Sequence, residues 1–247
     1  MPYNIVTTPD YLRSKEAYLF HALREQACLT VKIPEQLRQE VDNYLHELLV
    51  HGEEIVNSDL AFYRARLHEF DQHEGFSRDK MGAPPKQKTS QGRIQPQGQP
   101  VLYTATDADT AIAENRPSVA SLLTVGEFRP NCGEHIRVLN LTRHQKFSDC
   151  IGTSSIDEKK WNNILKSIYF SQREFSRQLH ADQPGRYLDT IYISQLIREK
   201  GFDGVAYKSL LHEGGVNYAF FTPEKLSCTE TLVYKVTSVR VQSEKRT

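Results

Sequence analysis

The sequence has little cysteine and nothing that resembles a membrane anchor. Its thiols are scattered, with no Cys-x-x-Cys pair, at Cys28, Cys132, Cys150 and Cys228. Scattered thiols are typical of a reduced, cytosolic protein. No apolar run approaches the length of about 20 residues that crosses a bilayer, and the N-terminal segment lacks a basic start followed by an apolar stretch. We therefore predict a cytoplasmic protein without a membrane partner.

The motifs of common cofactor and metal sites are also missing. No G-x-G-x-x-G follows a strand-like segment and no G-x-x-x-x-G-K-[ST] occurs, which argues against Rossmann hydride transfer and P-loop phosphoryl transfer. G-x-S-x-G and H-E-x-x-H are absent as well. Zinc binds residue types such as Cys132, His135, His144 and Cys150, but their spacing matches no common zinc finger. We expect no metal.

The chain carries no excess charge of either sign. Thirty-one Lys and Arg balance thirty-one Asp and Glu over 247 residues. Proteins that bind nucleic acid usually carry a basic excess, so we expect no direct nucleic-acid partner. A mean hydropathy of -0.56 is typical of a soluble globular protein, and the length suits one large domain or a domain with an appendage.

Residues 1–58 are predicted to be helical. The segment "IPEQLRQEVDNYLHELLVHG" repeats apolar residues at spacings of three and four, so that one face collects Leu37, Val41, Tyr44, Leu45 and Leu48. This pattern predicts an amphipathic helix that packs on the rest of the protein or on a partner. We therefore divide the chain into a helical N-terminal extension, 1–58, and a main domain, 59–247.

The main domain mixes strands and helices without regular alternation. Strand patterns occur at 60–66, 101–105, 118–128, 135–141, 205–207, 214–221 and 230–242. Helix patterns occur at 107–115, 157–179 and 187–200, with Asp107 as an expected N-cap and Gly201 as an expected C-terminal stop. Residues 68–99 are polar and predicted to be irregular. These patterns favour a mixed α+β fold with a mainly antiparallel sheet.

The stretch "FYRAR" places charge on a strand. Neighbouring side chains on a strand point to opposite faces, so Arg64 opposes Tyr63, and Arg66 lies on the side of Arg64. One interpretation is a solvated polar face with the tyrosine in the core. The other is an arginine aimed into a cleft, where its planar fork can grip a pyrophosphate.

Five further residues are ambiguous when each is taken alone. Arg93 lies in the polar loop, Tyr103 in the middle of a strand, and Glu114 among apolar residues of a short helix. Ser209 follows the strand at 205–207, and Asn217 opens the next one. Solubility, core packing and turn formation account for such residues as readily as a binding site does.

Taken in order, these segments resemble the RES domain family, which is named for its Arg, Glu and Ser. The resemblance runs from residue 60 to residue 222 through "FYRAR", "GRIQPQGQPVLYTATDADTAIAENRP", "TVGEF", "VLNL", "GFDGVAYKS" and "GGVNYAFF". It implies a fold similar to that of bacterial ADP-ribosyltransferase toxins. The catalytic residues that it implies are Arg64, Tyr103, Glu114 and Ser209. The NAD-binding residues that it implies are Tyr63, Arg64, Arg93, Tyr103 and Asn217.

The resemblance also implies that NAD is the substrate and that residues 59–247 form the catalytic domain. Members of the family are commonly toxins of bacterial toxin–antitoxin pairs, so an antitoxin is an expected partner, while self-association is left open. The expected reaction cleaves the bond between nicotinamide and ribose, with water or phosphate as the acceptor. Two alternatives remain: transfer of ADP-ribose to a macromolecule, and a noncatalytic module that binds RNA or protein through the loop 80–93.

Three features depart from the family pattern. Residues 1–58 lie outside the resemblance, and the region 142–186 is longer than in compact members. Gln95 stands where an asparagine is more usual. These differences bear on partner and regulation more than on the class of chemistry.

Overall fold

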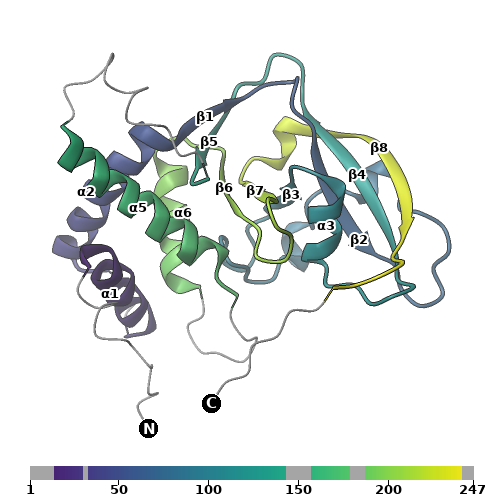
Figure 1. Cartoon of the computed structure of the whole chain (residues 1–247), viewed down its shortest axis with the longest axis horizontal. Helices are drawn as coiled ribbons and strands as arrows, with labels where there is room; N and C mark the ends of the chain where they lie inside the picture. The colour runs from purple at the N-terminus through teal and green to yellow at the C-terminus, as the bar shows by residue number, and fades with distance from the viewer. Residues whose placement is uncertain (1–13, 30–32, 143–156, 179–186, 241–247) are drawn as a thin grey trace, which may run out of the picture.

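The computed structural model describes residues 14–29, 33–142, 157–178 and 187–240 (Figure 1). The strands are β1 (Glu53–Val56), β2 (Phe62–Leu67), β3 (Leu102–Ala105), β4 (Leu122–Pro130), β5 (Ile136–Asn140), β6 (Gly204–Lys208), β7 (Val216–Phe220) and β8 (Leu226–Lys235). They form an eight-stranded sheet in the order β1-β5-β6-β7-β3-β2-β4-β8. The β5–β6 pair is parallel and the other pairs are antiparallel. The predicted mixed fold with a mainly antiparallel sheet is confirmed.

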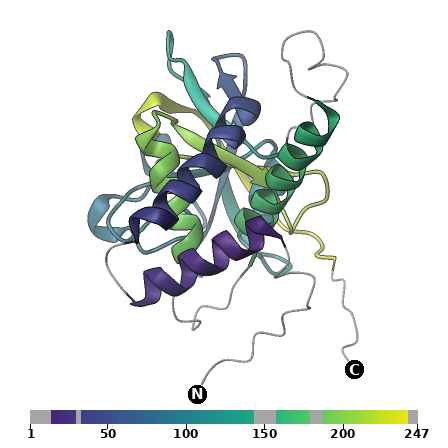
Figure 2. The ribbon, with the colours of Figure 1, turned by 90° about the vertical axis from the view of Figure 1, so that its left-hand side faces the viewer.

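Most of the helices gather at one end of this sheet. The α-helices are α1 (Lys15–Leu29), α2 (Glu35–Gly52), α3 (Ala108–Glu114), α5 (Glu158–Ser176) and α6 (Leu188–Glu199). Short 3-10 helices are η2 (Arg78–Lys80), η3 (Lys86–Lys88) and η4 (Pro223–Lys225). Helices α1, α2, α5 and α6 lie together in front of the sheet when it is seen from its β1 end (Figure 2). Helix α3 stands apart and packs on β2.

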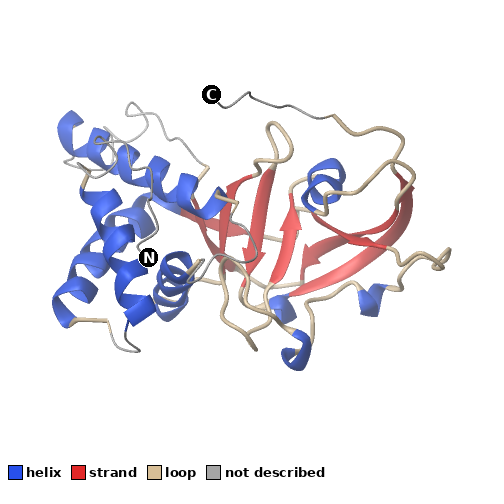
Figure 3. Ribbon diagram, turned by 90° about the horizontal axis from the view of Figure 1, so that it is seen from below, coloured by secondary structure: helices blue, strands red, loops and turns tan. Residues whose placement is uncertain are grey.

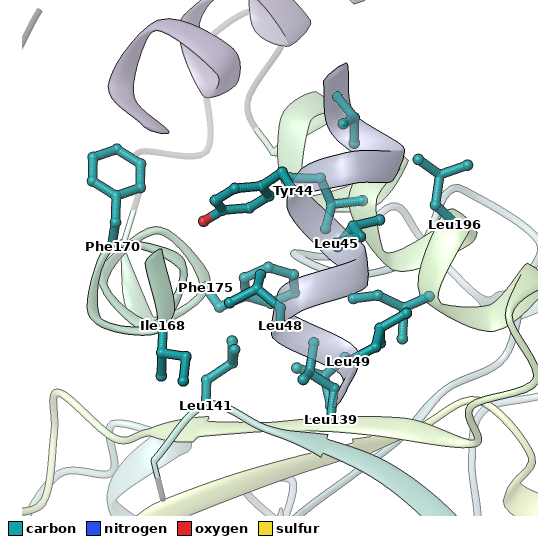
Figure 4. Close-up of a cluster of buried hydrophobic side chains, with 14 of the residues drawn as sticks. Tyr44, Leu45, Leu48, Leu49, Leu139, Leu141, Ile168, Phe170, Phe175 and Leu196 are labelled. Atoms are coloured by element: carbon teal, nitrogen blue, oxygen red, sulfur yellow. The ribbon is translucent and has the colours of Figure 1, made fainter. Parts of the chain in front are cut away.

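The four gathered helices share one hydrophobic core with β5 and β6. Figure 4 shows Tyr44, Leu45, Leu48 and Leu49 of α2 in this core, with Tyr44 directed toward α5. All five apolar residues predicted to share a face of α2 are buried. Burial of a leucine side chain stabilises a fold by about 1.5–3 kcal/mol, so the buried face of α2 contributes to holding this helix in place.

Residues 53–56 differ from the expected helix, because they form the edge strand β1. Strand β1 pairs with β5, where Glu53 faces Leu139 and Val56 faces Ile136. The β-branched pair Ile55 and Val56 favours an extended backbone, and Val56 is fully buried there. The division of the chain at residue 58 stays a prediction.

Helices α3 and α5 begin, and α6 ends, at residues suited to cap a helix. Asp107 accepts a hydrogen bond from the backbone N–H of Thr110, and Asp157 accepts one from Lys160. Gly201, just after α6, has a φ of +80°, a conformation that glycine adopts without strain.

The sheet is nearly divided between β2 and β3. Strand β2 pairs with β4 along six residues but meets β3 at one register position, Tyr63 opposite Ala105. The strands on the two sides of this junction splay apart (Figure 3).

Within the described ranges, no helix is both long and apolar enough to cross a membrane. The same ranges hold no group of three or more His, Cys, Asp or Glu residues placed to bind a metal ion. Two of the four residues with zinc-binding side chains, His144 and Cys150, lie outside the described residues.

Candidate active site

A cavity of about 820 Å³ opens where β2 and β3 separate. Its walls come from β2, β3, α3, the loop before β3, the ends of α5 and α6, β6 and β7. Six of the seven predicted site residues line it, namely Tyr63, Arg64, Arg93, Tyr103, Glu114 and Asn217. Residues separated by up to 154 positions in the sequence, from Tyr63 to Asn217, therefore meet in one place.

Glu114 is the last residue of α3, and its carboxylate is held on one side. Its Oε1 accepts hydrogen bonds from the hydroxyl of Ser209 at 2.7 Å and from the side-chain amide of Asn217 at 2.6 Å. Its Oε2 has no hydrogen bond to the described residues. The result is an oriented carboxylate on the cavity wall with one oxygen left for a ligand.

Ser209, the seventh predicted residue, is not part of the cavity wall. Its Oγ donates to Glu114 and accepts the backbone N–H groups of Leu211 and His212, each at 3.1 Å. With its one hydrogen directed to the carboxylate, the hydroxyl fixes the orientation of Glu114. This geometry suits Ser209 to position Glu114, and the catalytic role that the resemblance implies stays a prediction.

Arg64 is a partly buried cation on β2. Its Nη1 donates to the carbonyl oxygen of Met81 at 3.1 Å and to that of Gly82. Burial, with a contribution from Arg66, lowers the pKa of Arg64 to about 10. Among the described residues no carboxylate forms an ion pair with Arg64, so its charge remains available to an anion. The interpretation of Arg64 as aimed into a cleft fits this geometry better than that of a solvated face.

Arg66 and Tyr63 occupy the sides that the strand period predicts. Arg66 donates to the carbonyl oxygen of Lys80 and lies 4.0 Å from the ring centroid of Phe76, so it contacts the same loop as Arg64. Tyr63 packs with the small residues of β3 and α3 on the other face. Burial and then the nearby carboxylate of Glu127 raise the pKa of Tyr63, which keeps its hydroxyl protonated.

A wall of tyrosines surrounds Arg93. Its guanidinium carbon lies 5.4 Å from the ring centroid of Tyr207 and 5.8 Å from that of Tyr187. Burial opposes the charge, but Tyr207, Tyr187 and Glu114 together raise the pKa of Arg93. Its Nε is buried and has no hydrogen-bond partner within the described residues. Arg93 is thus a fixed cation between aromatic rings.

Tyr103 completes this wall from β3. Its hydroxyl donates to Oε1 of Gln95, and burial raises its pKa, so the ring stays neutral and oriented. Gln95 sits against Gly92, where an added Cβ would lie 2.6 Å from the amide. Gln95, which stands where an asparagine is more usual, therefore orients Tyr103 through this hydrogen bond. Its amide fits there because position 92 is a glycine.

Several wall residues were not found from the sequence, among them Tyr187, Tyr207, Asn115, Arg116 and Gln178. Tyr207 lies in the quoted strand segment "GFDGVAYKS", and its inward direction follows from pairing with Asn217 in β7. Arg116 has a φ of +48° and donates to Oε1 of Gln178 at 2.8 Å, joining the ends of α3 and α5. No sequence pattern indicates that Arg116 and Gln178 belong to the cavity wall.

The fold and the cavity define an α+β protein whose divided, mostly antiparallel sheet opens onto a site with one oriented carboxylate, four tyrosines and two partly buried arginines. The model of the RES domain matches residues 61–237, and the chain belongs to the RES domain family. No curated protein matches. One similar solved structure is the crystal structure of the M. tuberculosis MbcT–MbcA toxin–antitoxin complex. The similarity has a TM-score of 0.46 and 12% identity, and covers 79% of this chain and 94% of that one.

Proposed function

We propose that this protein cleaves the N-glycosidic bond between nicotinamide and ribose in NAD. The observation that carries the proposal is the carboxylate of Glu114, held through one oxygen by Ser209 and Asn217 beside a wall of tyrosines and arginines. Membership of the RES domain family supports the same reaction, since the resemblance implies NAD as the substrate.

Size and charge of the cavity suit a dinucleotide. A volume of about 820 Å³ lies in the upper part of the range of small-molecule sites. Arg64, with no ion-pair partner among the described residues, offers its planar fork to a pyrophosphate. Arg93 provides a second buried cation. Tyr103 and Tyr207 offer aromatic faces to the nicotinamide ring, which is positively charged in NAD.

The reaction develops positive charge on the anomeric carbon of the ribose. As the C–N bond breaks, its electron pair moves to the nicotinamide nitrogen, which becomes neutral, and the ribose takes oxocarbenium character. A carboxylate near that carbon or on the ribose hydroxyls stabilises this charge as it forms, which is the role we assign to Glu114. Water or phosphate then attacks the same carbon, and a proton is released from the attacking group.

The assay for this proposal follows nicotinamide release from NAD by the purified protein. Glu114→Gln keeps an oxygen for Ser209 and Asn217 but removes the charge, so we expect release to fall by at least about a hundredfold with the fold intact. Glu25→Gln, at an exposed position on α1, serves as the matched control and should release nicotinamide at the native rate. Intact NAD after long incubation with native protein would contradict the proposal.

The same assay separates the alternatives. Assays with and without inorganic phosphate distinguish water from phosphate as the acceptor, because only phosphorolysis requires phosphate. Label from NAD that appears on a protein or RNA would favour transfer of ADP-ribose to a macromolecule. RNA binding that weakens with salt, without NAD turnover, would favour the noncatalytic module.

We further infer that the protein acts as a bacterial toxin that depletes NAD and is neutralised by an antitoxin. Family membership supports this role. Expression in bacteria should lower cellular NAD and stop growth, and Glu114→Gln should do neither. Growth arrest by both forms would refute a toxicity that depends on NAD.

A further inference from the structure

The loop between β6 and β7 is attached to helix α3 by a chain of side-chain hydrogen bonds. Nδ1 of His212 lies 3.0 Å from Oγ1 of Thr110, and that hydroxyl lies 2.7 Å from Oδ2 of Asp107. Thr110 is fully buried, and His212 does not line the cavity. These three residues connect the start of the helix that ends in Glu114 to the loop that contains Ser209.

The direction of these hydrogen bonds follows from the groups involved. A carboxylate accepts only, so the hydroxyl hydrogen of Thr110 points to Asp107. Hydrogen bonds from Thr110 and Thr106, with the nearby His212, lower the pKa of Asp107 against the effect of burial, which keeps it ionised. The Thr110 oxygen then has only lone pairs for the histidine, and Nδ1 of His212 must carry a hydrogen.

The loop is compact and shaped around this attachment. The backbone N–H of His212 donates to Oγ of Ser209, and its carbonyl oxygen accepts the N–H of Gly215. A Cβ added at Gly215 would lie 2.3 Å from Oγ1 of Thr110, so the glycine lets the loop backbone rest directly on the threonine. Moving His212 therefore moves the hydroxyl that orients Glu114.

We propose that His212 is a positioning residue that fixes the loop 209–215 on α3 through Thr110 and so sets the hydrogen bond between Ser209 and Glu114. The role of His212 in turnover rests on the proposed function. The attachment itself does not, because it is a property of the folded loop.

The experiment compares His212→Ala with His212→Asn, whose side-chain amide places a donor near the position of Nδ1. The first readout is hydrogen–deuterium exchange of the loop amides. We expect exchange in 209–216 to rise on the order of tenfold in the alanine variant, as for the loss of one hydrogen bond, and to stay near native in the asparagine variant. Unchanged loop exchange in His212→Ala would overturn the proposal whether or not the protein cleaves NAD.

The second readout is nicotinamide release. His212→Ala should lower kcat about tenfold with little change in KM, and His212→Asn should restore it. In a Ser209→Ala background the same substitution should have almost no further effect, because the two residues act through one contact. Additive losses would refute the route through Ser209, whereas no release by native protein would refute the proposed function alone. His46→Ala, at an exposed position on α2, is the control and should match native in both readouts.

Discussion

Arg24 on α1 joins the N-terminal helices to the wall of the cavity through buried charge. Its Nε and Nη2 donate to Oδ2 of Asp189 at 2.9 and 2.5 Å, and Nη2 also donates to Oε2 of Glu174 at 3.2 Å. The side chains of Asp189 and Glu174 are 0% and 2% exposed. Arg177, which precedes the wall residue Gln178, pairs with the same two carboxylates.

Replacing Arg24 by methionine keeps much of the side-chain volume and removes the charge. Two carboxylates would then remain buried in a cluster that has lost one of its cations. Removing one partner of a buried ion pair costs about 3–5 kcal/mol. Because Arg24 is itself 20% exposed and Arg177 remains, we expect a loss near the lower limit, about 3 kcal/mol in the free energy of unfolding.

Urea unfolding followed by circular dichroism measures this loss, and an unchanged m-value identifies it as a change in stability. Arg38→Met is the matched control, because Arg38 is 46% exposed and pairs with Glu199 and Asp42 on the surface. Such pairs contribute about 0–1 kcal/mol, so the control should unfold close to native. Equal midpoints for the two variants would refute the view that α1 neutralises buried charge in the body of the protein.

Two further predictions concern stability. The pKa of Asp107 is lowered from its ordinary value of 3.8, because hydrogen bonds from Thr110 outweigh the effect of burial. The unfolded chain therefore binds a proton at Asp107 more readily than the folded protein does. The stabilisation that ionised Asp107 provides is present at pH values above its unfolded pKa and is lost as the pH falls through its folded pKa. Acid titration should show a shallower decline for Asp107→Asn, and an unchanged decline would contradict this assignment. Gly204→Ala would place a Cβ 2.7 Å from the carbonyl oxygen of Ala219 in the neighbouring strand, so we expect a loss of about 1–3 kcal/mol in thermal unfolding. Gly82→Ala, where a Cβ meets nothing within 4 Å, should lose much less.

Local signals predicted much of the fold. The spacing of Leu37, Val41 and Leu45 predicted the buried face of α2, and Asp107 begins its helix as the expected N-cap. These features depend on residues within one or two turns of each other, so the sequence contains them directly. Residues 53–56 were missed because a four-residue edge strand owes its stability to pairing with β5, more than eighty residues away.

The site could be predicted as far as its residues occur in motifs that follow the order of the RES domain family along the chain. Glu114 and Asn217 meet in the structure, but their contact depends on a strand order that no local pattern encodes. The contribution of Ser209 as a support for Glu114, and the aromatic wall at Tyr187 and Tyr207, follow from tertiary packing. Such contacts cannot be derived from periodicity, because they join separate elements.

The meeting of β2 and β3 at one register position has a mechanical consequence. Fewer paired positions join β2 to β3 than join β2 to β4 or β3 to β7, so this junction is the weakest point of the backbone ladder in that part of the sheet. Tyr103 belongs to β3 and Arg64 to β2. Both residues line the cavity, so its two sides are connected through a short stretch of strand pairing.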